Sequence, residues 1–154
     1  MTIGQIAPDF TLHDSDKNEV SLYDQKGKNV LLLFFPLAFT STCTKELCSV
    51  RDDIARYENT SATVFGISVD SYATLKKFKE EQGYNFTLLS DFNKEASTAY
   101  NCIYNDFNGW MKGVSKRAAF IIDKTGILQY AEILEKAGEL PNFEAIQKVL
   151  EELA

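Results

Sequence analysis

The chain has 154 residues, of which 45% are hydrophobic and 25% charged, and its formal net charge is −6. This composition is that of an ordinary globular protein that can bury a core, and the length predicts one domain over residues 1–154. An acidic balance argues against nucleic-acid binding, which needs a basic surface. The longest apolar run, at 30–35, is far too short to span a membrane.

The N-terminal segment and the low number of cysteines both favour a reducing compartment inside the cell. The first ten residues have neither the basic region nor the apolar core of a signal peptide, so we expect a cytoplasmic protein. Three cysteines do not make a disulfide scaffold, and in a reducing compartment they are more often catalytic or inert. With a single histidine, His13, they also do not offer the closely spaced ligands of a zinc site.

Apolar patterns along the chain predict alternating strands and helices. In chain order these are strands at 10–12, 19–22 and 30–35, a helix capped by Thr42 and continuing to Tyr57, a strand at 63–69, a helix capped by Asp70 or Ser71 and extending toward Tyr84, a strand at 87–89, a short helix at 93–100, strands at 118–122 and 127–133, and a helix at 142–153. Alternation predicts a parallel sheet, and the late hairpin adds antiparallel strands. We therefore expect an α/β protein with a thioredoxin-like fold, whose central mixed sheet is flanked by helices and extended by an N-terminal hairpin.

A cysteine stands where the central strand gives way to a helix. Cys43 follows the run at 30–35 by way of the segment 36–42. Helix N-termini present free N–H groups and the positive end of the helix dipole, which favour the thiolate that attacks electrophiles. Open α/β sheets also place their sites at the carboxyl ends of strands. The alternative is a buried cysteine that acts only as a small hydrophobic residue.

Pro36 and Thr40, which precede Cys43 in the chain, are suited to the site of a nucleophile. Thr40 can turn its hydroxyl toward the sulfur or toward a bound oxygen, and Pro36, with no N–H and a rigid ring, can shield a thiolate from water. A nearby arginine would stabilise the thiolate, because guanidinium is always charged. Arg51 follows on the same helix, but roughly two turns away, so we expect no contact with the sulfur.

Three segments together resemble the peroxiredoxin family. Pro36, Thr40 and Cys43 form Pro-x-x-x-Thr-x-x-Cys, which is similar to the family's active-site signature. Gly4 to Leu12 resembles its usual opening, and Lys116 to Asp123 resembles its late strand with an arginine. The resemblance covers nearly the whole chain, with the three motifs in the family's order.

The resemblance implies a thiol-dependent peroxidase that reduces hydrogen peroxide or organic hydroperoxides. Cys43 would be the peroxidatic cysteine, which attacks the O–O bond and becomes a sulfenic acid. Thr40 would hydrogen-bond the peroxide, Arg117 would polarise its oxygens beside the sulfur, and Pro36 would shield the site. Glu46 matches a family position that often holds an arginine in place. No metal, flavin or haem is needed for this chemistry.

The resemblance also implies partners. The reductant would be a thioredoxin- or glutaredoxin-type protein or a small thiol, and the chain would form a homodimer.

From the residues alone, Arg117 fits a solvated strand edge as well as a site. Tyr104, Phe107 and Trp110 fit either packing or a dimer surface.

The role of Cys48 stays open at this point. Its spacing from Cys43 resembles the peroxiredoxin Q or bacterioferritin-comigratory group, in which a second cysteine resolves the sulfenic acid as an intrachain disulfide. On an ideal helix the two Cα atoms would be roughly 8.6 Å apart, which is beyond disulfide reach. The bond therefore requires local unfolding of about two helical turns. The alternative is that Cys48 packs in the core and an external thiol completes a one-cysteine mechanism.

Two subgroups of the family fit the sequence. The segments 37–40 and 105–112 look closer to the alkyl hydroperoxide reductase E group, which often works with one cysteine. The peroxiredoxin Q group more often has Pro-Gly before the nucleophile, where this chain has Ser41 and Thr42. Cys102 carries no motif, and we expect it to pack in the core.

Two other functions remain as alternatives. A thioredoxin-like disulfide oxidoreductase would need Cys-x-x-Cys, which is absent. A redox sensor or chaperone-like module would use the same reactive thiol but would not be recycled by a thiol donor.

Overall fold

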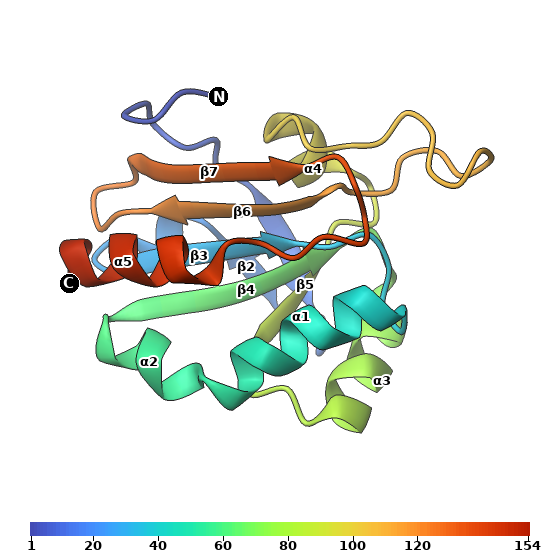
Figure 1. The fold of residues 1–154 in the computed structure, drawn as a ribbon, viewed down its shortest axis with the longest axis horizontal. Coiled ribbons are helices and arrows are strands. Elements are labelled where there is room, and N and C mark those ends of the chain that lie inside the picture. The colour runs from blue at the N-terminus through green and yellow to red at the C-terminus, as the bar shows by residue number, and fades with distance from the viewer.

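The computed structural model describes all residues, 1–154, and is built on one seven-stranded sheet (Figure 1). Its strands lie in the order β2-β1-β5-β4-β3-β6-β7. The elements are β1 (Thr11–Asp14), β2 (Glu19–Ser21), β3 (Asn29–Phe34), α1 (Ser41–Asp52), α2 (Ile54–Asn59), β4 (Ala62–Ser68), α3 (Tyr72–Gln82), β5 (Thr87–Ser90), α4 (Glu95–Ala99), β6 (Arg117–Ile122), β7 (Leu128–Leu134) and α5 (Phe143–Leu153), with a 3₁₀ turn at Tyr23–Gln25.

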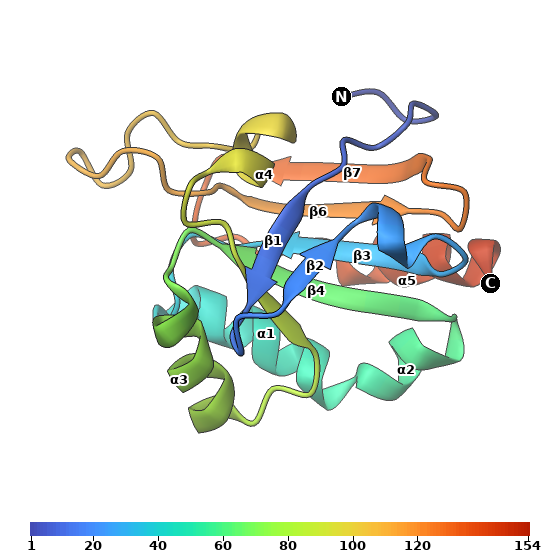
Figure 2. The same ribbon diagram turned by 180° about the vertical axis from the view of Figure 1, so that it is seen from behind.

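Strand pairing confirms the mixed sheet and the N-terminal hairpin. Strands β3, β4 and β5 run parallel, whereas β6 joins β3 antiparallel and β7 follows β6 antiparallel. The hairpin of β1 and β2 is not a separate flap, because β1 also pairs with β5 at His13 and Asp14. Figure 2, the view from behind, shows the hairpin on the viewer's side of the sheet. The fold is therefore the thioredoxin-like arrangement that the sequence predicts.

Alternating side chains of β3 divide the core into two layers. Val30, Leu32 and Phe34 belong to one cluster of 17 buried residues, and their neighbours Leu31, Leu33 and Phe35 belong to a second cluster of 17. This period-two alternation is what a central strand buried on both faces requires.

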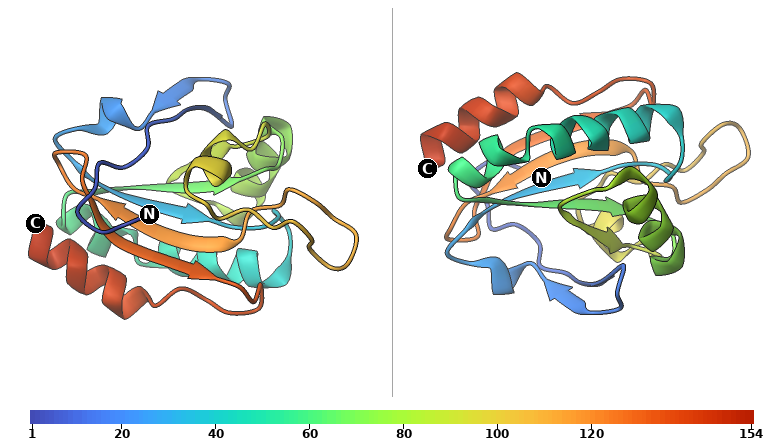
Figure 3. Two further views of the ribbon diagram at one scale, coloured as in Figure 1. Left: turned by 90° about the horizontal axis from the view of Figure 1, so that it is seen from above. Right: turned by 90° about the horizontal axis from the view of Figure 1, so that it is seen from below.

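Helices and the N-terminal segment cover the two faces of the sheet. Side chains of α1, α2, α3 and α5 join the second cluster, whereas those of α4 and the N-terminal segment join the first. Figure 3 shows α1 and α5 on one side of the sheet and the hairpin on the other. It also shows the segment 104–113 projecting beyond the end of the sheet. No helix is both long and apolar enough to cross a membrane.

The helix boundaries correct three details of the sequence prediction. Thr42 is not the N-cap of α1, because Thr40 has the extended backbone of a cap and its carbonyl accepts the first helical hydrogen bond from the Thr44 N–H at 2.9 Å. The helix predicted to reach Tyr57 is interrupted at Asp53, after which α2 begins. Tyr84 lies beyond α3, because Gly83 takes the left-handed conformation that ends a helix.

Side chains cap two other helices, and Ser71 is one of the two residues predicted to cap α3. Ser71 caps α3 by accepting a hydrogen bond from the Thr74 N–H, and Asn142 caps α5 by accepting one from the Ala145 N–H. Each satisfies a backbone donor that the helix itself leaves unpaired.

Leu32 provides a test of the central strand. Its side chain is fully buried, so Leu32→Ala leaves a cavity and should lower the free energy of unfolding by about 2–5 kcal/mol. Urea unfolding of the reduced protein measures this change. Ile3→Ala is the control, because Ile3 is 52% exposed and its truncation should change stability by less than about 0.5 kcal/mol. Equal losses in the two variants would contradict the proposed core.

Candidate active site

The carboxyl end of β3 and the start of α1 place Cys43 inside the protein. The chain leaves β3 at Phe34, passes through the segment 35–40, and enters α1 two residues before Cys43. The side chain of Cys43 is only 1% exposed and belongs to the second core cluster. A sulfur in this position reacts only with molecules that enter a small opening beside it.

A buried arginine lies against the sulfur. Arg117 is the first residue of β6, and its Nη2 atom donates to Sγ of Cys43 at 3.3 Å and to the carbonyl of Ala137 at 2.8 Å. Its Nη1 atom donates to Oε1 of Glu46 at 2.6 Å. Arg117 and Glu46 are almost fully shielded from water. Arg117 is therefore a buried site residue and not a solvated strand edge.

The charge of Arg117 is maintained by its two partners. Burial opposes the charge, but the attraction of Glu46 and of Cys43 outweighs it and raises the pKa of Arg117 above its usual value. A full positive charge therefore lies 3.3 Å from the sulfur of Cys43. The start of α1 adds the positive end of the helix dipole.

Glu46 orients Arg117 from one turn further along α1. Burial raises the pKa of Glu46 from 4.5 to about 7, although Arg117 acts in the opposite direction. Its Oε1 atom accepts from Arg117, whereas Oε2 has no hydrogen-bond partner. Glu46 thus holds the guanidinium in place while its own charge is sensitive to pH near neutrality.

A cavity of about 270 Å³ opens beside the sulfur. Its wall is formed by the segment between β3 and the start of α1 and by two later loops. Its lining residues are Pro36, Leu37, Thr40, Ser41, Thr42, Cys43, Phe107, Asn108, Arg117, Ala137 and Gly138. The Thr40 hydroxyl donates to the Leu37 carbonyl at 2.8 Å, so the lone pairs of its oxygen are free to accept a hydrogen bond from a molecule in the cavity. Pro36 is buried in the same wall. Four of the predicted site residues therefore meet in one cavity, with Glu46 behind Arg117.

Two contributors to the site are absent from the sequence prediction. Asp70, considered there only as a helix cap, accepts hydrogen bonds on Oδ2 from the Ala38 N–H at 2.8 Å and from the Ser68 hydroxyl at 2.6 Å. It thereby fixes the loop that carries Pro36 and Thr40. The sequence signal for this role is the position of Asp70 just after β4, the strand that pairs with β3. The second contributor, the Ala137 carbonyl, is a backbone group and has no sequence signal.

Cys48 lies outside the cavity. It is half-buried, and Sγ is 3.6 Å from both Oε1 of Gln82 and the hydroxyl of Tyr84. Both cysteines belong to the same continuous helix, α1, so the helical separation of roughly 8.6 Å between their Cα atoms applies. The two thiols are free in this structure.

Cys102 and Arg51 behave as the sequence predicts. Cys102 is fully buried in the core, and burial raises its pKa to about 12, so the thiol stays protonated and unreactive. Arg51 pairs with Asp52 and with the Gln82 carbonyl, not with Cys43.

Across the chain, no group of three His, Cys, Asp or Glu side chains is arranged to hold a metal ion.

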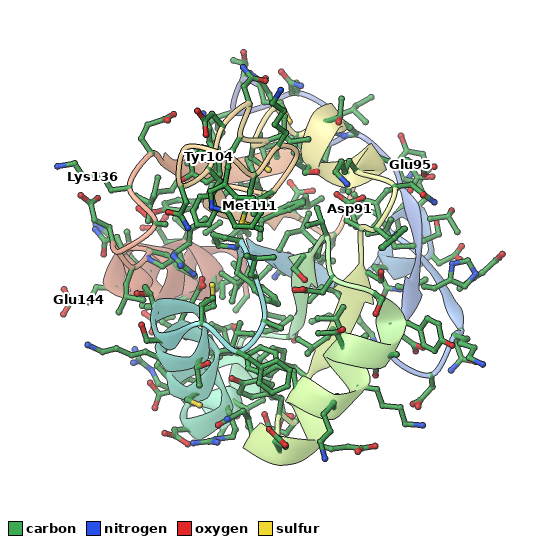
Figure 4. All side chains as sticks on the ribbon, turned by 90° about the vertical axis from the view of Figure 1, so that its right-hand side faces the viewer. Asp91, Glu95, Tyr104, Met111, Lys136 and Glu144 are labelled. Atoms are coloured by element: carbon green, nitrogen blue, oxygen red, sulfur yellow. The ribbon has the colours of Figure 1, made fainter.

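The loop after α4 carries Tyr104, Phe107 and Trp110, for which the sequence left packing and a dimer surface open. Two of them pack together and one is exposed. The rings of Tyr104 and Phe107 pack together with centroids 5.2 Å apart, and the Tyr104 hydroxyl donates to the Glu135 carbonyl. Trp110 is instead 75% exposed. Figure 4 shows this loop, marked by Tyr104 and Met111, on the face that also carries the start of α1.

Comparison with known proteins identifies the family. Residues 3–131 match the model of the AhpC/TSA family. The chain therefore belongs to this family, the peroxiredoxins, which are thiol-dependent peroxidases.

Relatives in two subgroups are similar to this chain. Alkyl hydroperoxide reductase E of Mycobacterium tuberculosis is 39% identical over 143 residues, covering 91% of this chain and 90% of that protein. The chloroplastic peroxiredoxin Q of Triticum aestivum is also 39% identical, over 127 residues that cover 82% of this chain and 57% of that protein. Among solved structures, peroxidoxin BcpB from Mycobacterium tuberculosis superposes with a TM-score of 0.87 at 26% identity, covering 100% of this chain and 99% of that chain.

The titration of Glu46 predicts a dependence of stability on pH. Because burial raises its pKa to about 7, the folded protein retains a proton on Glu46 that the unfolded chain releases near 4.5. This group therefore makes the free energy of unfolding fall as pH rises from about 4.5 to about 7. Glu46→Gln should remove that part of the slope, as measured by urea unfolding of reduced protein at several pH values.

Glu46→Gln also weakens the pair with Arg117 and so lowers stability at every pH. The informative quantity is therefore the slope of the unfolding free energy against pH. Glu58→Gln is the matched control, since Glu58 is exposed and should leave the slope unchanged. Parallel curves for the wild type and Glu46→Gln would show that Glu46 is not buried as a weak acid.

Proposed function

We propose that Cys43 is the peroxidatic cysteine of this enzyme and that Arg117 is its electrostatic partner. The observation that supports this most directly is the 3.3 Å contact between Nη2 of Arg117 and Sγ of Cys43 inside a cavity. The thiolate attacks one peroxide oxygen, the O–O bond breaks, and the leaving oxygen departs as an alcohol or water after taking a proton. Cys43 is then a sulfenic acid.

Thr40 and Arg117 bind the peroxide from two sides. The Thr40 oxygen accepts a hydrogen bond from the peroxide O–H, because its own proton is used on the Leu37 carbonyl. Arg117 stabilises the negative charge that develops on the leaving oxygen as the O–O bond breaks. Pro36 excludes water from the sulfur, and Glu46 keeps the guanidinium oriented. Substrates include hydrogen peroxide and organic hydroperoxides, since only the peroxide group needs to reach the sulfur.

Cys48 resolves the sulfenic acid in the proposed cycle. Its thiol attacks the sulfur of Cys43, a disulfide forms and water leaves. The partly buried position of Cys48, which is not sealed in the core as Cys102 is, and its place on the same helix as Cys43 support this route. Their separation requires the first two turns of α1 to open. The competing route is a one-cysteine mechanism, in which an external thiol attacks Cys43 directly.

A thiol reductant completes either route. Two electrons from a thioredoxin- or glutaredoxin-type protein or from a small thiol return the enzyme to its reduced form. We also propose a cytoplasmic enzyme, where such reductants are available, and a homodimer. Trp110, Phe92 and Phe39 are exposed to 75%, 62% and 47%, and such aromatic side chains support an interface.

Cysteine variants test the proposed roles. Cys43→Ser should abolish peroxide consumption with a thiol donor, because a hydroxyl cannot replace the thiolate. Cys48→Ser should retain the first oxidation step but accumulate sulfenic acid, as seen by stopped-flow oxidation and mass spectrometry of trapped peptides. Cys102→Ser is the control and should keep both steps. Oxidation of Cys43→Ser at the wild-type rate would refute the assignment, and turnover by Cys48→Ser with external thiol would favour the one-cysteine route.

Arg117 variants test the electrostatic partner. Arg117→Lys keeps a charge but loses the planar group that reaches Glu46, Cys43 and Ala137 together. We expect the second-order rate of Cys43 oxidation to fall about 10- to 100-fold, which is the effect of losing one hydrogen bond to a charged group. Arg51→Lys is the matched control and should change the rate by less than two-fold. Equal effects of both variants would contradict a specific role of Arg117.

A further inference from the structure

We propose that Tyr84 is a positioning residue for the resolving step: it holds the first two turns of α1 closed and sets how often Cys48 is released. This inference rests on the proposed intrachain route, but its central element, a fastened helix, is measurable without any disulfide. Tyr84 lies between α3 and β5, far along the chain from both cysteines.

The hydroxyl of Tyr84 contacts both ends of the segment that must open. It donates to the carbonyl of Thr44, the residue after Cys43, at 3.4 Å, and it lies 3.6 Å from Sγ of Cys48. Burial, followed by the hydrogen bond to Cys48, raises the pKa of Tyr84, so its hydroxyl keeps its proton at neutral pH. One group therefore holds the helix backbone beside the first cysteine and the thiol of the second.

The Cys48 thiol is also held by the end of α3. Its single S–H proton goes either to Oε1 of Gln82 or to the Tyr84 hydroxyl oxygen, both 3.6 Å from Sγ, and Arg51, one turn further along α1, donates to the Gln82 carbonyl. The side chain of Asn85 donates to the Arg51 carbonyl at 3.3 Å. A thiol that donates its proton in this way is not a nucleophile until it is released and ionised.

The ring of Tyr84 belongs to an aromatic cluster that also holds the segment between β3 and α1. It packs edge-on against Phe78 with centroids 5.1 Å apart, and Phe78 packs against Phe39 at 4.9 Å. Phe39 has φ of 67°, a left-handed conformation that is unfavourable for a bulky residue and persists only when its surroundings hold it. The cluster thus holds the chain on both sides of Cys43.

Opening of α1 must break these contacts before the two sulfurs can meet. After oxidation, Cys48 loses its contacts with Tyr84 and Gln82, its thiol gives up a proton, and its sulfur bonds to the sulfur of Cys43 as hydroxide leaves with that proton as water. Loss of one hydrogen bond between neutral groups changes an opening equilibrium about five-fold. Removal of the Tyr84 hydroxyl should therefore make the helix open more often.

Tyr84→Phe is the direct test, because it keeps the ring that packs on Phe78 and removes only the hydroxyl. Tyr100→Phe is the matched control: this buried tyrosine lies in the other core cluster, and its hydroxyl donates to the Pro8 carbonyl. In the reduced proteins, hydrogen exchange of the peptide 43–48 should be about five-fold faster in Tyr84→Phe and unchanged in Tyr100→Phe.

The second measurement is the rate of disulfide formation after one equivalent of hydrogen peroxide. Quenched alkylation and mass spectrometry give the ratio of the Cys43–Cys48 disulfide to sulfenic acid over time, which separates resolution from the first oxidation. We expect this ratio to rise about five-fold faster in Tyr84→Phe.

The outcomes separate this inference from the proposed function. Equal exchange in Tyr84→Phe and Tyr100→Phe would overturn the role of Tyr84. Faster exchange in Tyr84→Phe without any disulfide in either protein would support the role of Tyr84 and overturn the intrachain route. Faster exchange together with faster disulfide formation supports both.

Discussion

The buried guanidinium of Arg117 is the interaction on which the site depends. A charge removed from water is stable only when opposite charges and hydrogen-bond acceptors surround it. Glu46 and Cys43 from α1 and the Ala137 carbonyl after β7 provide these partners. Because the partners come from two separate segments, the same cation that lies against the sulfur also joins α1 to the loop after β7.

Glu46 and Cys43 share one positive partner. Near neutral pH the raised pKa of Glu46 allows it to be partly protonated, which weakens its charge pairing with Arg117. The Oε2 atom of Glu46 and the Nε atom of Arg117 lack hydrogen-bond partners. Such incomplete pairing destabilises a buried site, and unpaired buried polar groups of this kind are concentrated at functional sites.

The sequence predicts the parts of the site that are local in the chain. The apolar run of β3, the start of α1 and the motif of Pro36, Thr40 and Cys43 lie within 20 residues of one another, and periodicity together with the family resemblance places them correctly. Arg117 is different. From the residues alone it equally fits an exposed strand edge, because its burial depends on the antiparallel register that pairs Phe34 with Ala118 and sets Arg117 just beyond the end of β3.

Asp70, Ala137 and Tyr84 show why the remaining contacts were beyond sequence reasoning. Each contacts a segment distant in the chain: the Asp70 carboxylate accepts from a backbone N–H, Ala137 offers a backbone carbonyl and Tyr84 a hydroxyl, and none belongs to a motif. Their positions follow from how the loops close at one end of the sheet. These contacts hold a strained loop and the start of α1. On the proposed intrachain route the fold therefore has two opposing effects at Cys43: it fixes the sulfur for reaction with peroxide and delays its encounter with Cys48. On that route, a helix that brought the two thiols into immediate contact would move Cys43 away from Arg117 and from the cavity beside it.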